Sequence, residues 1–189
     1  QSTVEYFPGL RAELHGGWKS FKWVAGAEGE YRTYRIRQAN NLREAPAQLV
    51  DPYVEARVGG ALMLDAGVRL ETLFVKDQLP RAEFSPRGAL RWRPTDWLEL
   101  NAEAGRSHRP PNAAYLVGLP DGAYLGLERA DAIGGGARVV AGPWSFQAGG
   151  WTRWMRNLAT FERDGSLGGS YGRATGFEGQ VTVDWPDLS

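Results

Sequence analysis

The residues best suited to binding chemistry stand at the head of the longest stretch without a regular pattern, roughly His108 to Asp131. His108 and Arg109 are adjacent there, and Tyr115 and Tyr124 follow in the same stretch. An imidazole and a guanidinium can contact an anionic group, while phenol rings supply flat contact area for a ligand. We predict that His108, Arg109, Tyr115 and Tyr124 bind a ligand. The alternatives stay open that the histidine is only solvated and that the loop packs on itself.

No pattern in the sequence indicates catalysis or a metal centre. The chain has no Cys and only two His, which excludes thiolate sites and histidine clusters. Glu99 and Glu103 could form a carboxylate pair, but charges on a water-facing side of a strand need no catalysis to explain them. The glycine-rich stretches at 134–138 and 165–172 lack the strand–loop–helix context of a phosphate loop. We therefore expect no enzyme activity, no catalytic residue, no metal ion and no cofactor.

Composition indicates a folded chain that is not helical. The 189 residues are 42% hydrophobic and carry 22 basic and 22 acidic residues, so no overall field draws the chain to nucleic acid. Its 25 Gly and 11 Pro disfavour helix interiors. No apolar run approaches the roughly 18 residues of a membrane helix. The first residues, QSTVEYFPGL, show no signal peptide, so we expect that one was removed or that the true start lies elsewhere.

Apolar and polar residues alternate along most of the chain, and this pattern predicts the strands that would position the candidate ligand-binding side chains. In the clearest segment, Leu98 and Leu100 share one parity and Glu99 and Asn101 the other, as in a strand with water on one side only. Reading the parity onward predicts about nine strands. They are expected at 6–15, 21–34, 51–57, 62–71, 87–93, 98–105, 132–140, 144–154 and 177–185.

The predicted connections alternate between short and long, and this order favours a membrane barrel. Short turns are expected at 16–18, 58–61, 93–97, 141–143 and 185–189. Long loops are expected at 37–48, 76–86, 108–131 and 162–172. Outer-membrane barrels sort their loops in this way because successive strands cross the membrane in opposite directions. Aromatic residues near strand ends, such as Trp92 and Trp144, fit the girdles at the two membrane interfaces. We therefore expect outer-membrane lipid on the apolar face.

Four stretches of the chain, within 52–185, resemble the barrel of TonB-dependent outer-membrane receptors. They read YVEARVGGALMLDAGVRLETLFV, FSPRGALRWRPTDWLELNAEAGRSHRPP, LERADAIGGGARVV and YGRATGFEGQVTVDW. Their order matches a Gly-x-Arg strand, a Ser-Pro-Arg strand, a Pro turn, an Arg-x-Pro strand end and a Gly-x-Glu strand. The matching positions here are Gly67 and Arg69, Ser85 to Arg87, Pro94, Arg109 and Pro110, and Gly176 and Glu178.

The resemblance implies an all-β, up-and-down antiparallel transmembrane barrel segment in the outer membrane of a Gram-negative bacterium. It implies uptake of a scarce small-molecule nutrient, such as a siderophore, cobalamin, sugar or peptide, with energy from a TonB-type partner. We expect residues 1–189 to be a single barrel domain or an excerpt of one, without a plug domain, so that coupling to TonB would need a missing plug segment. An odd strand count also points to a larger barrel, because single-chain bacterial barrels close with an even number.

Two other functions remain open from the sequence. A passive porin or structural barrel would share the strands and loops but lack a plug and a high-affinity ligand. A soluble glycan-binding β-protein is the third reading, because Trp-rich strands and loops also suit sugar stacking.

Overall fold

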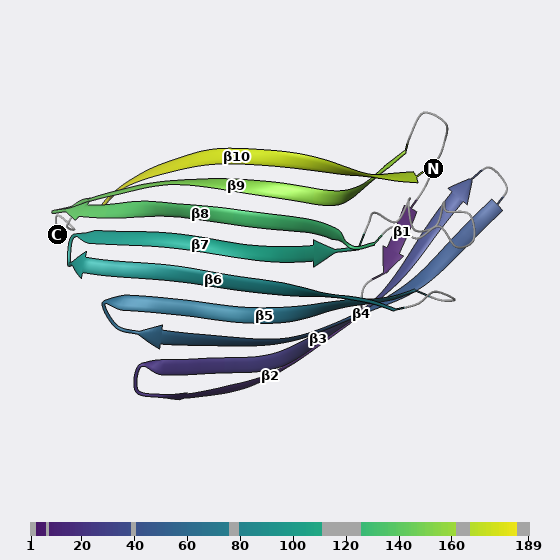
Figure 1. Cartoon of the computed structure of the whole chain (residues 1–189), viewed down its shortest axis with the longest axis horizontal. Helices are drawn as coiled ribbons and strands as arrows, with labels where there is room; N and C mark the ends of the chain where they lie inside the picture. Colours follow the sequence, from purple (N-terminus) through teal and green to yellow (C-terminus); the bar gives the residue numbers. More distant parts are fainter. Residues whose placement is uncertain are drawn as a thin grey trace, which may run out of the picture.

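The computed structural model describes residues 3–6, 8–38, 41–75, 80–110, 126–161 and 167–184, and in these ranges the chain forms ten strands (Figure 1). No helix in this part of the chain is long and apolar enough to cross a membrane. The strands are β1 (Thr3–Tyr6), β2 (Gly9–Trp18), β3 (Phe21–Gln38), β4 (Asn41–Gly59), β5 (Leu62–Val75), β6 (Arg81–Thr95), β7 (Leu98–Arg109), β8 (Glu128–Ala141), β9 (Trp144–Phe161) and β10 (Leu167–Val183).

All ten strands belong to one antiparallel sheet in which each strand from β3 onward pairs with the next. β1 and β2 both pair with β3: β1 covers Thr33 to Ile36 and β2 covers Phe21 to Glu30. Because β4 pairs along the whole of the other edge of β3, β1 and β2 lie one after the other along the remaining edge and together take one strand position in the sheet. The sheet therefore has nine positions across, which confirms the predicted meander of about nine strands.

The register places the apolar parity of every strand on the same face of the sheet. Leu64 lies opposite Leu90, Leu90 opposite Ala102, and Ala102 opposite Gly135. Large apolar side chains on this face are exposed. From β2 to β10 they include Leu10, Leu14, Phe21, Trp23, Tyr31, Val50, Val54, Val58, Leu62, Leu64, Val68, Phe74, Phe84, Leu90, Trp92, Ile133, Trp144, Phe146, Trp154, Phe177 and Val181.

No second layer covers this apolar face in the described residues. On both faces together, the described part of the chain has few buried apolar residues: Ala47, Tyr53, Leu73, Leu127 and Ala159. Burying apolar surface contributes about 25 cal/mol of stabilisation per Å², and this contribution is lost if the apolar face stays in water. A single curved layer with one continuous apolar face is suited to lipid on that face, and it fits a part of a larger barrel.

The short turns lie at one end of the sheet, at residues 19–20, 60–61, 96–97 and 142–143. The prediction that the first turn lies at 16–18 is wrong, because β2 continues to Trp18 and the turn residue Lys19 has a φ of 51°. Gly59, before the second turn, has a φ of 134°, and a Cβ there would lie 1.9 Å from the carbonyl oxygen of Leu62. This turn requires glycine.

Strands extend into three of the predicted long loops. β3 and β4 pair as far as Gln38 and Asn41, so a loop over 37–48 is wrong, and β6 and β10 begin earlier than expected, at Arg81 and Leu167. Beyond the apolar band both faces of a strand can be polar, so the alternation is lost while the backbone ladder continues. The fourth loop is confirmed as the longest connection, between Arg109 and Glu128. We call it the 110–127 connection; residues 111–125 lie outside the described part.

Candidate functional site

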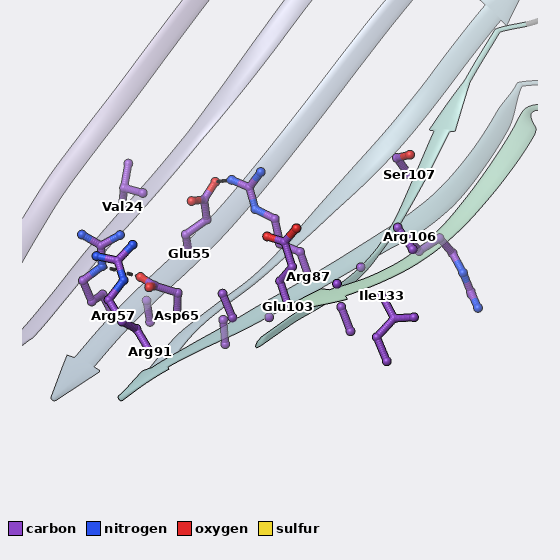
Figure 2. Close-up of a pocket in the computed structure, with 18 of the residues that line it drawn as sticks. Val24, Glu55, Arg57, Asp65, Arg87, Arg91, Glu103, Arg106, Ser107 and Ile133 are labelled. Atoms are coloured by element: carbon purple, nitrogen blue, oxygen red, sulfur yellow. Dashed lines mark hydrogen bonds and ion pairs between the residues drawn. The ribbon is translucent and has the colours of Figure 1, made fainter. Parts of the chain in front are cut away.

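The polar parity of the strands forms the second face of the sheet, and this face is hollowed. The hollow has a volume of about 900 Å³ and is lined by side chains from β2 to β9. Figure 2 shows the side chains of Glu55, Arg87 and Glu103 on this side, whereas those of Ile133 and Arg106, residues that also border the hollow, point in the opposite direction. Charged residues therefore line the concave face, and the convex face carries the apolar side chains.

Ion pairs connect neighbouring strands across the floor of the hollow. Arg57 of β4 pairs with Asp65 of β5, and Arg87 of β6 reaches over β5 to pair with Glu55 of β4 (Figure 2). Gly67 lies between the second pair, and a Cβ there would be 2.8 Å from the Cγ of Glu55. The missing side chain of Gly67 thus leaves the space in which Glu55 and Arg87 meet.

A buried tyrosine organises the charges on β2 to β5. The Tyr53 hydroxyl donates a hydrogen bond to Glu13, and its ring lies between two guanidinium groups, 5.2 Å from that of Arg69 and 5.7 Å from that of Arg11. Arg69 also lies 3.4 Å from a carboxylate oxygen of Glu28. The sequence motif residues Gly67, Arg69 and Arg87 therefore all belong to the charged network of the concave face.

Trp151 is an aromatic residue on the charged face that the sequence analysis did not select as a site. It lines the hollow with Glu103 and Arg153, and its side chain is 41% exposed. Its indole ring lies over Gly176, where a Cβ would be 2.6 Å from a ring carbon. Trp151 lies opposite Gly134 on one neighbouring strand and Gly176 on the other. These glycines leave room for the indole ring, but they can be recognised as its neighbours only when the register is known.

His108 lies in a buried polar cluster at the root of the 110–127 connection. Its side chain is 4% exposed, and its Nδ1 lies 2.9 Å from the Ser85 hydroxyl and 3.2 Å from a Glu71 carboxylate oxygen. The same carboxylate oxygen accepts hydrogen bonds from the Ser85 hydroxyl and from the His108 backbone N–H, the latter at 2.5 Å. Glu71 thus binds the end of β7 to β5 and β6.

Arg109 has the opposite environment to its neighbour. Its side chain is 73% exposed, and its Nε donates to Glu128 at 2.6 Å, joining the last residue of β7 to the first of β8. Tyr115 and Tyr124 lie outside the described residues. Within the described ranges, no group of three His, Asp or Glu residues is placed to hold a metal ion.

Comparison with known families decides the identity of the fold. Residues 5–189 match the family described as TonB dependent receptor-like, beta-barrel. The chain belongs to the TonB-dependent receptor β-barrel family. The charged concave face therefore corresponds to the inside of a receptor barrel, and the apolar convex face to its outside.

Solved structures share the fold of this receptor barrel at low sequence identity. The FrpB iron transporter of Neisseria meningitidis (F3-3 variant) has a TM-score of 0.79 at 14% identity, over 97% of this chain and 34% of that one. The copper transporter OprC has a TM-score of 0.75 at 18% identity, over 96% and 35%. The alcaligin outer-membrane receptor FauA of Bordetella pertussis has a TM-score of 0.66 at 14% identity, over 95% and 35%. No curated protein sequence matches the chain.

The chain spans about a third of the length of these solved structures. At 11–18% identity the likeness shows a shared fold alone. The solved proteins are transporters or receptors by name, and none is named as an enzyme.

Replacing Glu71 by Ala should destabilise this part of the receptor barrel. The change removes the acceptor shared by the Ser85 hydroxyl and the His108 N–H, and leaving a buried donor without a partner costs about 1–3 kcal/mol. The free energy of unfolding of the full-length protein in lipid, from urea titration, measures the loss. Glu83→Ala is the matched control, because Glu83 pairs with Glu71 in register but is exposed. Equal losses for both variants would contradict a bracing role of Glu71.

Proposed function

We propose that this chain forms part of the barrel wall of an outer-membrane receptor that takes up a scarce small-molecule nutrient. The observation that supports this most strongly is the division of a single-layer sheet into two faces in a chain of this family. Charged side chains with Tyr53 and Trp151 line the concave face. Exposed Leu, Val, Phe and Trp side chains cover the other. Such a wall separates an aqueous interior from lipid.

The proposal places the protein in the outer membrane of a Gram-negative bacterium. Outer-membrane lipid would contact the apolar face, and the nutrient would be a siderophore complex, cobalamin, a sugar or a peptide. We assign the whole of residues 1–189 to the barrel domain. Coupling to a TonB-type energy-transducing protein would then run through a plug segment outside this stretch.

The 110–127 connection is the proposed place of nutrient recognition. His108 and Arg109 stand at its root, and Tyr115 and Tyr124 lie within it. The exposure of Arg109 supports a direct contact with an anionic group on the nutrient. Because the His108 side chain is buried and fixed by Glu71 and Ser85, its part in recognition would be to hold the root of the connection in one position. We propose no catalytic step and no cofactor.

Energy dependence of uptake tests the proposal. Cells that express the full-length gene are given a panel of radiolabelled ferric siderophores, cobalamin and oligosaccharides, with and without a protonophore. We expect accumulation of one class against its gradient and loss of that accumulation with the protonophore. A passive porin would instead admit small solutes of several classes whether or not the protonophore is present, and that result would overturn the receptor assignment.

A further inference from the structure

One cross-strand row on the convex face is charged instead of apolar. Arg106 of β7 lies opposite Asp131 of β8, Asp131 opposite Trp154 of β9, and Trp154 opposite Arg173 of β10. Two residues nearer the short turns, the same face carries the row Ala104, Ile133, Thr152 and Thr175. The apolar surface therefore ends at a defined row on these four strands.

The charged row lies where a membrane-crossing strand reaches the second interface. Counted from the short-turn end of each strand, Arg106 is the ninth residue, and Asp131, Trp154 and Arg173 are each the eleventh. A tilted strand crosses the hydrocarbon layer in about 9–11 residues. Trp144 starts β9 at the other interface, so Trp144 and Trp154 fit the two aromatic girdles of a barrel.

Positive charge exceeds negative charge around this row. Arg129 pairs with Asp131 at 2.6 Å and lies opposite Arg156 in register, on the same face and further from the short turns. Arg106 also pairs with Asp131, at 2.7 Å. We define the basic belt as Arg106, Arg129, Arg156 and Arg173. Asp131 is the one carboxylate that the described residues place in an ion pair with any of them.

The guanidinium groups of the basic belt are accessible from outside the barrel. Arg156 and Arg173 are exposed, and the Arg106 side chain is 36% exposed. Arg173 lies over the Trp154 ring, 5.8 Å from its centroid, which fixes it at the interface. In Figure 2, Arg106 points to the side away from Glu103 and the hollow.

The belt is local to β7–β10. On β5 and β6 the convex face carries Leu70 opposite Phe84, and Phe74 beyond them. A general polar rim would continue around the sheet, so the arginines mark a particular place on the rim. Across three strand spacings, Arg106 and Arg173 lie roughly 14 Å apart, enough to contact more than one anionic group.

We propose that the basic belt binds the phosphate groups of an outer-leaflet lipid whose headgroup carries two phosphates. Guanidinium groups bind phosphate oxygens in bidentate geometry. The acyl chains of such a lipid lie against Ile133 and Phe177, which stand in the next two rows toward the short turns, while its headgroup meets the arginines at the level of Trp154. The side chains of this site lie on the outside of the barrel, although Arg106 and Ile133 also border the hollow, and the site is separate from the proposed place of nutrient recognition.

Titration of the full-length receptor in zwitterionic detergent with lipid A that carries two phosphates tests the proposal. The test variant is Arg106→Gln with Arg156→Gln and Arg173→Gln, which leaves Arg129 to pair with Asp131. The control variant removes three cations from the concave side: Lys22→Gln with Arg91→Gln and Arg153→Gln. Native mass spectrometry reports the bound lipid, and heat-modifiable gel mobility confirms that each barrel is folded.

We expect the test variant to bind lipid A at least about tenfold more weakly than the wild type, because three charge-assisted contacts are lost. The control variant should bind within about twofold of the wild type, as expected when only long-range, screened charge changes. Lipid A stripped of its phosphates should bind weakly to all three proteins. Unchanged binding by the test variant, an equal loss in the control variant, or displacement of the lipid by inorganic phosphate would each overturn the proposal.

Discussion

A full-length receptor that lacks residues 111–126 is expected to assemble normally and to accumulate none of its nutrient. Assembly should survive because Arg109 and Glu128 pair in register and through an ion pair. In the deletion variant Asn and Gly replace Pro110 and Leu127, because a two-residue hairpin turn needs positive φ angles that proline cannot adopt. Uptake should fail because the deletion removes Tyr115 and Tyr124 from the proposed recognition site. Accumulation of the radiolabelled nutrient and gel mobility of the folded barrel measure the two effects.

A variant with residues 111–126 in scrambled order controls for loop length and composition. If recognition depends on the placement of the tyrosines, the scrambled loop should fail in uptake as completely as the deletion. Arg109→Gln in the intact loop should weaken nutrient binding, since a contact to a charged group contributes about 1.5–3 kcal/mol. Wild-type uptake in the deletion variant would show that the 110–127 connection is not part of the recognition site, and it would favour the alternative function of a passive barrel.

The faces of the strands could be predicted from sequence because the alternation has a physical cause. Within the membrane a strand has lipid on one side and water on the other, so Leu98 and Leu100 share a parity opposite to Glu99 and Asn101, and the register confirms this across β6 to β8. Beyond the membrane that cause is absent. Residues 37–48 therefore look like a loop although β3 and β4 pair through most of them.

The environment of His108 could not be predicted because it depends on residues far away in sequence. Glu71 and Ser85 precede His108 by 37 and 23 residues, and they meet it only because β5, β6 and β7 are neighbours. Trp151 is a similar case, since its place over Gly176 depends on the register of β9 and β10. Sequence patterns identify the face of a residue, whereas contacts between strands require the register.

Leu100→Arg should destabilise the barrel in lipid, and it is the strongest test of which face meets the membrane. Leu100 lies opposite Trp92 of β6 and Ala137 of β8 on the convex face. An arginine on the lipid face costs about 2–4 kcal/mol at the midplane and about 0–1 kcal/mol near the interfaces, because its charge loses hydration that the hydrocarbon layer does not replace. Leu100 is the third residue of β7 from the short-turn end and lies between these depths, so we expect a loss of roughly 1–3 kcal/mol. Urea unfolding of the full-length receptor in lipid vesicles measures this loss directly.

Asn101→Arg is the matched control, one residue further along the same strand. Asn101 is exposed on the concave face and lies opposite Gly136 of β8, which has no side chain to obstruct a longer residue, and opposite Arg91 of β6. Glu99, on the same face of β7, supplies a carboxylate that already pairs with Arg91 and Arg93. The new guanidinium would remain in water, where attraction to Glu99 opposes repulsion from Arg91. The unfolding free energy should therefore change by less than about 1 kcal/mol, as is usual for exposed charge pairs. Because the two substitutions add the same side chain at adjacent positions, a difference between their losses could not arise from strand propensity or added charge alone. Equal losses would show that both faces meet the same solvent, and the barrel-wall assignment of the two faces would be wrong.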